Sequence, residues 1–136
     1  MGAHHILLIE DNPGDVRLIE ESLRAHALDY RISHYETADA AIHAIACCGS
    51  NGTTVPDLIL IDYNIPRGDA RDILAAASKN PALNTIPKAI VTSFVAPRER
   101  QQAVELGATC FINKPQNLDS FLTEVGATIV ELLGCD

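Results

Sequence analysis

The sequence predicts one α/β domain with a mainly parallel sheet, and three observations support this fold class. Short, almost continuous apolar runs, typical of strands buried on both faces, alternate with amphipathic stretches of helical period. The chain has 136 residues, which is enough for a single core. Its composition, 47% hydrophobic and 21% charged, is that of a folded globular protein. Because strands and helices fill the chain without repeats, we expect one domain over residues 1–136.

The first part of the chain is expected to form two strand–helix pairs. The first strand covers residues 4–10, where Ile and Leu predominate. A helix begins at Pro13, because proline fits the first helical turn, and continues to about residue 27. Residues 30–36 alternate between apolar and polar, which predicts a less buried strand near the edge of the sheet. A second helix, rich in Ala and Ile, follows at about residues 37–48.

The middle of the chain contains its longest loop and two further strands. Gly, Ser, Asn and Thr mark residues 49–56 as a loop that is too short to link two domains. A strand at 57–62 and a helix at about 69–79 follow it. Prolines then bracket an irregular segment before a strand at 87–92.

The last part is expected to form a helix, a strand and a final helix. Pro97 at the start and Gly107 just past the end define the first of these helices. The fifth strand covers residues 109–113, and the last helix covers about 117–133. That helix carries apolar residues along one side, namely Leu118, Phe121, Leu122, Val125, Ile129 and Leu132.

Charge and composition exclude several classes of partner. The formal net charge of −8 argues against direct binding of nucleic acid and of anionic membrane surfaces, which both need clustered Lys and Arg. No apolar stretch approaches the roughly 20 residues that span a bilayer. Residues 1–5 lack the pattern of a secretory signal, so we expect a cytoplasmic protein. The four cysteines (47, 48, 110 and 135) have no metal-binding spacing and are expected to be free thiols.

Charged side chains occur where three of the predicted strands end. Glu10 and Asp11 follow the first strand, Asp62 ends the third, and Lys114 follows the fifth. Open α/β sheets bind ligands at the carboxyl edge, where these ends meet. An aspartate accepts a phosphoryl group only where the incoming charge is neutralised, and a divalent cation and a lysine can do this. Thr92, at the end of the fourth strand, offers a hydroxyl that can contact phosphoryl oxygens.

Four segments, in order, resemble the receiver domain of two-component response regulators. They are ILLIEDN (6–12), DLILIDYNIP (57–66), AIVTS (89–93) and GATCFINKP (107–115). The resemblance covers essentially the whole chain. It implies a three-layer, flavodoxin-like domain, with a five-stranded parallel sheet and helices on both faces, and no separate output domain. Residues 10–23 further resemble the single-domain regulators that are paired with phytochrome-type histidine kinases in bacteria.

The resemblance implies the acceptor and a Mg²⁺ site. Asp62 would accept a phosphoryl group from the phosphohistidine of a histidine kinase. Asp11 and Asp62 would bind Mg²⁺ through their carboxylates, Asn64 through its backbone carbonyl, and Glu10 through water. The protein would catalyse only its own phosphorylation and dephosphorylation.

The resemblance also implies a switch. Lys114 would pair with the phosphoryl oxygens, and its peptide bond to Pro115 would be cis. Thr92 would be the switch hydroxyl, and Phe111 occupies the aromatic switch position. Phosphorylation would change the face formed by the fourth helix, fifth strand and fifth helix, which would bind a protein partner or a second copy of the chain.

The sequence departs from the family at two places. Ala70 stands where the family usually has Gly, so we expect the loop to shift and Gly68 to take over its bend. Phe94, two residues after Thr92, occupies a position that influences access of water to the acyl phosphate. We hypothesise that Phe94 shields Asp62 and slows dephosphorylation.

Two other functions remain open at this point. One is a receiver-like interaction module that works without phosphorylation. The other is a phosphohydrolase of the haloacid dehalogenase type, which also uses an aspartyl nucleophile, Mg²⁺ and a lysine. That class needs a second Asp two residues after the nucleophile, where this chain has Asn64, and no cap domain is visible.

Overall fold

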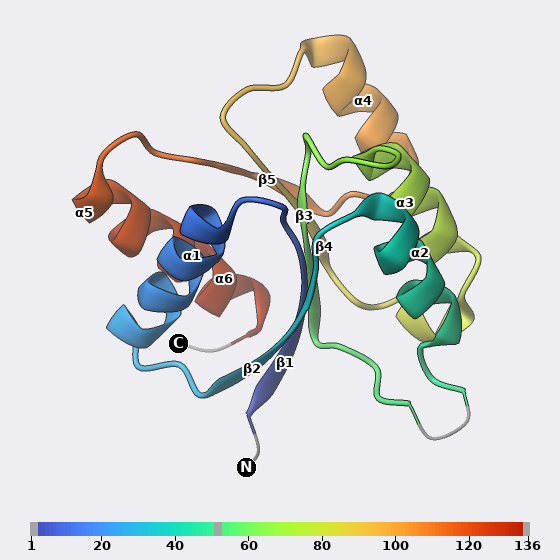
Figure 1. Cartoon of the computed structure of the whole chain (residues 1–136), viewed down its shortest axis with the longest axis horizontal. Coiled ribbons are helices and arrows are strands. Elements are labelled where there is room, and N and C mark those ends of the chain that lie inside the picture. The colour runs from blue at the N-terminus through green and yellow to red at the C-terminus, as the bar shows by residue number, and fades with distance from the viewer. Residues whose placement is uncertain (1–2, 51–52, 135–136) are drawn as a thin grey trace.

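The computed structural model describes residues 3–50 and 53–134, which form a parallel sheet of five strands with helices on both faces (Figure 1). The strand order is β2-β1-β3-β4-β5, and all neighbouring strands are parallel. The predicted fold class is therefore confirmed. The strands are β1 (His4–Ile9), β2 (Tyr30–Tyr35), β3 (Leu58–Asp62), β4 (Lys88–Thr92) and β5 (Cys110–Asn113).

The helices occur where the sequence predicts them, with one addition and one irregularity. The addition is a short 3-10 helix before β4, and the irregularity is a π-helical segment inside the last helix. The helical elements are α1 (Pro13–Ala25), α2 (Ala38–Cys47), α3 (Ala70–Ser78), η1 (Pro81–Leu83), α4 (Pro97–Glu105), α5 (Leu118–Ser120), η2 (Phe121–Val125) and α6 (Gly126–Leu132). Elements α5, η2 and α6 follow one another directly, and we call them together the C-terminal helix.

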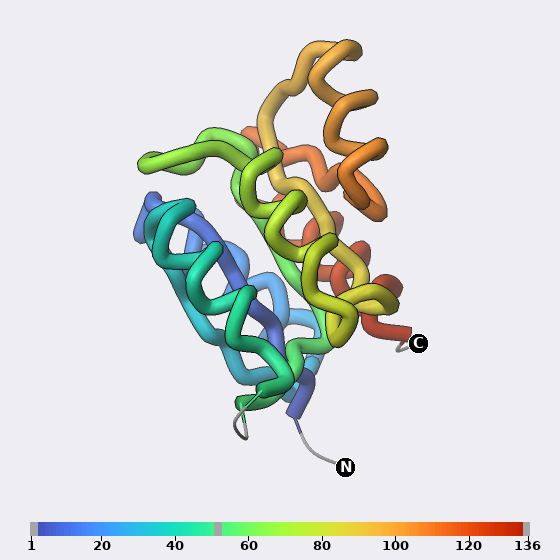
Figure 2. The backbone as a smooth tube through the Cα atoms, turned by 90° about the vertical axis from the view of Figure 1, so that its right-hand side faces the viewer, coloured from blue at the N-terminus to red at the C-terminus, as the bar shows by residue number. Residues whose placement is uncertain are grey.

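Two hydrophobic cores lie on opposite faces of the sheet. Successive strand side chains point to opposite faces, so Ile6 and Leu8 pack toward α1 and the C-terminal helix, whereas Leu7 and Ile9 pack toward α2 and α3. Figure 2 shows α2, α3 and α4 arranged across one face. Strand β2 is an edge strand, as its alternating pattern predicts.

The C-terminal helix lies unusually close to α1 at Gly126. A Cβ atom at this position would lie 2.3 Å from Cδ2 of His26 and 2.7 Å from the backbone oxygen of Ser22. The Ser22 hydroxyl donates to the carbonyl of Leu122 at 2.7 Å, and Nε2 of His26 lies 3.0 Å from the carbonyl of Thr123. Side chains of α1 and of its C-cap, His26, thus satisfy carbonyl groups of the π-helical segment, where the regular helical bonding pattern is interrupted.

The cysteines and the hydropathy fit the sequence expectations for the described part of the chain. Cys47, Cys48 and Cys110 are free thiols there, while Cys135 lies outside the described residues. Within the same part, the helices are too short or too polar to cross a membrane.

Candidate functional site

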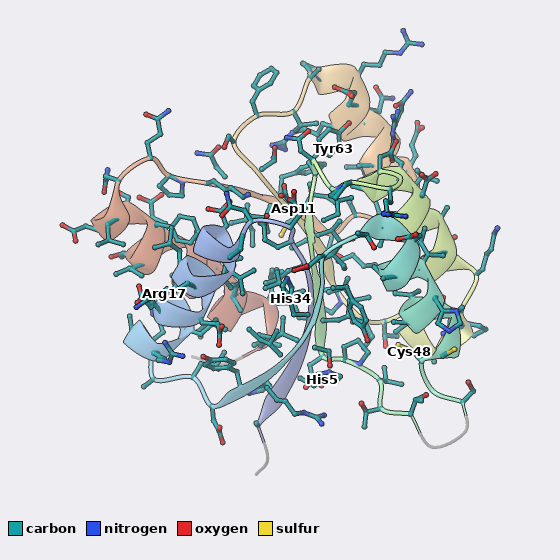
Figure 3. All side chains as sticks on the ribbon, in the orientation of Figure 1. His5, Asp11, Arg17, His34, Cys48 and Tyr63 are labelled. Carbon is teal, nitrogen blue, oxygen red and sulfur yellow. The ribbon has the colours of Figure 1, made fainter. Side chains whose placement is uncertain are left out.

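Three acidic side chains meet at the carboxyl edge of the sheet. Glu10 follows β1, Asp11 comes next, and Asp62 is the last residue of β3. One carboxylate oxygen from each lies within 4.8 Å of the others. Glu10 and Asp62 are 1% and 6% exposed, whereas Asp11 is exposed to solvent at this upper edge (Figure 3). Such a set of hard oxygen donors, open on one side, fits a divalent cation such as Mg²⁺.

Lys114 brings the positive charge to this acidic group. Its Nζ lies 3.1 Å from Oε1 of Glu10, 3.6 Å from Oδ2 of Asp62, and 2.8 Å from Oδ2 of Asp15. Burial by itself would lower the pKa of Lys114, but the hydrogen bond that Lys114 donates to Asp15 and the charges of Asp62 and Glu10 outweigh burial and raise it. The ammonium group is therefore a fixed positive charge at the edge.

Asp15 is a member of the site that the sequence analysis missed. It lies in the first turn of α1, and its side chain is 25% exposed. The available signal was its position four residues after Asp11, at the start of a helix that begins beside the acidic pair. An acid in a first helical turn is so often a partner of the helix dipole that sequence alone favours that interpretation.

The surroundings of Glu10 raise its pKa. Burial, together with a side-chain hydrogen bond to Asp62 and the charge of Asp62, raises the pKa of Glu10 to about 8, although Lys114 opposes the shift. The raised pKa shows that negative charge on Glu10 is poorly compensated here. A cation among these oxygens would supply the missing positive charge, which is a further reason why the donor set fits a metal.

The backbone around Glu10 and Asp11 is held by side chains from two elements. Asn12 caps α1, since its Oδ1 accepts from the amides of Gly14 at 2.8 Å and Asp15 at 3.3 Å. Nε2 of His34, on β2, lies 2.7 Å from the carbonyl oxygen of Glu10. These contacts fix the turn that carries the acidic pair.

Asn64 and the loop after β3 lie next to Asp62. The amide of Asn64 donates to Oδ1 of Asp62 at 3.2 Å. The bend falls on Arg67 (φ 60°) and Gly68 (φ 130°), so Gly68 takes it over as expected. Ala70 is then the first residue of α3, after an Asp69 cap, and needs no glycine freedom.

Thr92 and Phe111 lie on the neighbouring strands β4 and β5. The Thr92 hydroxyl donates to the carbonyl of Phe94 at 2.9 Å and accepts from the amide of Phe94 at 3.1 Å. Phe111 is half-buried, and the guanidinium carbon of Arg100 lies 4.2 Å from its ring centroid. A cavity of about 180 Å³ is lined by both predicted switch residues and by Phe94 and Arg100.

The structure contradicts the expected cis peptide bond before Pro115 and leaves Phe94 exposed. The predicted cis bond between Lys114 and Pro115 is wrong, because every peptide bond of the described residues is trans. For an X–Pro bond the two isomers differ by only about 0.5–1 kcal/mol, so tertiary contacts decide between them. The ring of Phe94 is 76% exposed, so in this structure it does not cover Asp62.

Polar contacts that the sequence did not predict connect the segment after β3 to α4. The hydroxyl of Tyr63, the residue after Asp62, donates to Oε2 of Glu99 at 2.7 Å. Burial and this hydrogen bond raise the pKa of Tyr63 to about 12. Nη1 of Arg71 donates to Oε1 of Gln102 at 2.6 Å. The segment that follows the acceptor is therefore bonded to the helix nearest the predicted switch.

This fold, with its acidic group and lysine at the carboxyl edge, defines an α/β signalling domain of the response-regulator class. The chain belongs to the response regulator receiver domain family, whose profile it matches over residues 6–126. The family is a signalling class, and the match gives no support to the phosphohydrolase alternative.

Individual relatives are similar over most of their length. The response regulator Rcp1 of Synechocystis is 32% identical over 114 residues, which cover 83% of this chain and 78% of Rcp1. The crystal structure of the phosphorylated cyanobacterial phytochrome response regulator RcpA is 28% identical, has a TM-score of 0.85, and aligns over 97% of this chain and 95% of RcpA. The Mn²⁺-bound form of Rcp1 is 30% identical, has a TM-score of 0.83, and aligns over 96% and 94% of the two chains.

Proposed function

We propose that this receiver accepts a phosphoryl group on Asp62 from a histidine kinase and that phosphorylation switches a protein-binding surface. The observation that carries the proposal is the position of Lys114. Its ammonium lies 3.6 Å from Asp62 and also contacts the side chains of Glu10 and Asp15. A phosphoryl group brings negative charge to a place that is already acidic, so a fixed cation is a requirement for accepting it.

Mg²⁺ is the metal we propose for the acidic group, held by the carboxylates of Asp11 and Asp62, with Asn64 and Glu10 as further ligands. The oxygen donor set supports a hard cation, and receiver domains bind divalent metal in this acidic pocket; the similar protein Rcp1 has been solved with Mn²⁺. When bound, the cation supplies positive charge beside the incoming phosphoryl oxygens.

The residues of the chain have separate roles in the transfer. An oxygen of Asp62 attacks the phosphorus of the phosphohistidine, the phosphorus–nitrogen bond breaks, and the imidazole leaves with its electron pair. The amide of Asn64 holds Oδ1 of Asp62 and so limits rotation of the carboxylate. Lys114 donates to an oxygen of the transferred group, which becomes an acyl phosphate on Asp62.

Phosphorylation then competes for the Thr92 hydroxyl. In the structure this hydroxyl is bonded to the backbone of Phe94, and it must leave that partner to reach a phosphoryl oxygen. The cavity of about 180 Å³ beside Phe111 is space into which the ring can move. Because Arg100 stacks on Phe111, a moving ring would also move α4.

The surface affected by this change is the face formed by α4, β5 and α5, and we propose that it binds a protein partner or a second copy of the chain. Val104 on α4 and Leu118 on α5 are large apolar side chains that are each 54% exposed on these elements, which supports this choice. Sedimentation with and without acetyl phosphate and Mg²⁺ tests homodimerisation, since a mass unchanged by phosphorylation contradicts a phosphorylation-dependent dimer.

The similar proteins support a proposal for the kinase that donates the phosphoryl group. Since RcpA is a phytochrome response regulator, we propose a phytochrome-type histidine kinase as the donor. We place the protein in the cytoplasm, where its free thiols stay reduced. The net charge of −8 continues to argue against nucleic acid and anionic membranes as partners.

Phosphotransfer from a panel of histidine kinases tests the proposed function. The wild type should be labelled by at least one phytochrome-type kinase in the presence of Mg²⁺, whereas Asp62→Asn should not. Asp29→Asn is the matched control, because Asp29 is an exposed acid directly before β2, at the opposite edge of the parallel sheet, and it should be labelled like the wild type. If Asp62→Asn is labelled as well as the wild type, the assignment of the acceptor is wrong. If no kinase or small phosphodonor labels the wild type, the phosphorylation-independent module is the better description.

A further inference from the structure

Asp15 is the closest partner of Lys114, although it is not one of the residues that the family resemblance assigns to the site. The distance from Nζ of Lys114 to Oδ2 of Asp15 is 2.8 Å, compared with 3.1 Å to Glu10 and 3.6 Å to Asp62. Only the first two are hydrogen bonds. Lys114 is thus held by its neighbours more closely than by the acceptor.

The structure fixes Asp15 in this position. Its amide donates to Oδ1 of Asn12, the cap of α1, and Pro13 begins the same turn. The Asp15 side chain is 25% exposed and that of Lys114 is 13% exposed, so solvent screens this pair only in part. The carboxylate therefore stays within reach of the ammonium rather than moving freely on the surface.

A phosphoryl group on Asp62 needs the same ammonium. Phosphorylation adds about −1.5 to −2 charge and three strong acceptor oxygens at the acceptor. An ammonium has only three N–H donors, and two of them are bonded to carboxylates in this structure. Asp15 and the phosphoryl group thus compete for one cation, and contacts that favour one state oppose the other.

We propose that Asp15 is a positioning residue that holds Lys114 in the unphosphorylated state and releases it when a phosphoryl group arrives. The inference rests on the proposed function, because it assigns a resting-state partner to the lysine of the same site. It makes a prediction of definite sign: removing the Asp15 carboxylate favours the phosphorylated state. A residue that merely supported the fold would weaken that state.

Binding of beryllofluoride, a mimic of the phosphoryl group, measures this competition without a kinase. ¹⁹F NMR titrations at saturating Mg²⁺ give the affinity for the wild type, Asp15→Asn and Asp15→Ser. Loss of a partly exposed charged pair is worth up to about 1 kcal/mol, so both variants should bind about threefold to fivefold more tightly. Asp15→Glu keeps a carboxylate within reach and should return the affinity toward that of the wild type.

Two controls separate a contact with Lys114 from a general effect of charge. Glu21→Gln removes one negative charge from the same helix, where Glu21 pairs with Arg17 and not with Lys114, and its affinity should equal that of the wild type. Salt is the second control. A remote charge effect disappears between about 0.05 M and about 0.5 M NaCl, whereas a contact effect keeps most of its size.

The outcomes are distinct. Equal or weaker beryllofluoride binding by both Asp15 variants overturns the inference, and so does an effect that Glu21→Gln reproduces or that high salt abolishes. Unfolding curves show whether each variant folds, and two substitutions are used so that one unstable protein does not decide the result. If the wild type itself binds no beryllofluoride, the proposed function fails; if the wild type binds and the variants match it, only the role of Asp15 fails.

Discussion

Replacing Gly126 by alanine tests the close approach of the C-terminal helix to α1. The added Cβ atom would lie 2.3 Å from Cδ2 of His26, 2.5 Å from the hydroxyl of Ser22 and 2.7 Å from the backbone oxygen of Ser22. The His26 ring can turn away, but the Ser22 oxygen is part of the α1 backbone and cannot. The C-terminal helix must therefore move outward from α1.

The size of the effect follows from opposing contributions. Overpacking of a buried contact costs about 1–3 kcal/mol, and loss of the bond from Ser22 to the carbonyl of Leu122 costs about 1 kcal/mol more. The higher helix propensity of alanine returns about 1 kcal/mol. We therefore expect Gly126→Ala to lower the free energy of unfolding by about 1–3 kcal/mol.

Urea denaturation of the wild type and Gly126→Ala measures this difference. Thr128→Ala is the control for helix propensity, because Thr128 is a partly exposed residue two positions further along α6 whose hydroxyl donates within the same helix, to the carbonyl of Glu124, and its substitution should change stability by less than about 1 kcal/mol. The sign of the result is decisive, since glycine to alanine in an open helix is stabilising. A Gly126→Ala protein at least as stable as the wild type would refute the close approach of the two helices.

Three further predictions concern the site. Tyr63→Phe removes the hydrogen bond to Glu99 and should lower the free energy of unfolding by about 1 kcal/mol; it should also remove the phenol that ionises near pH 12 in ultraviolet titration. Folding raises the pKa of Glu10 from 4.5 to about 8, so the folded protein binds this proton more tightly than the unfolded chain. The stability that this proton contributes is present below pH 4.5 and is lost as the pH rises to about 8. In EDTA the free energy of unfolding should therefore fall by at least about 1 kcal/mol over that range. Phe94→Glu should shorten the lifetime of the acyl phosphate on Asp62 if Phe94 limits access of water in the phosphorylated state.

A specific result would contradict each of these three predictions. A wild-type ultraviolet titration with no tyrosine component near pH 12 beyond what Tyr63→Phe shows would exclude the bond to Glu99. Glu10→Gln should remove the Glu10 contribution to the pH dependence, so the same slope in wild type and variant would assign the proton to another group. Equal phosphoprotein lifetimes in wild type and Phe94→Glu would dispose of the shielding hypothesis, which the 76% exposure of the ring already weakens for the unphosphorylated state.

The strands and the edge site could be predicted because both depend on short-range patterns. Runs such as Ile6–Ile9 and Leu58–Ile61 are buried on both faces only in a parallel sheet, and parallel strands bring their carboxyl ends to one edge. Glu10 and Asp62 must then meet whatever the details of the loops. Even the weaker alternating pattern of residues 30–36 carried enough information to place β2 at the edge.

The missed features depend on contacts between distant segments. In the sequence, Gly126 lies neither at a predicted turn nor at a predicted helix cap. Only the approach of α1 explains both this glycine and the neighbouring π-helical segment. Asp15 lies 99 residues from Lys114, and Tyr63 lies 36 residues from Glu99. Neither pair has a local signature. The same holds for the trans bond before Pro115, which local chemistry leaves nearly undecided.

Identifying the phosphorylated residue tests the central claim most directly. The protein is incubated with acetyl phosphate, the acyl phosphate is reduced with borohydride, and mass spectrometry locates the modified side chain. We expect the modification at Asp62 alone, with Mg²⁺ present, and its loss in EDTA. Modification of a different residue, or equal modification of Asp62 without any divalent metal, would contradict the account.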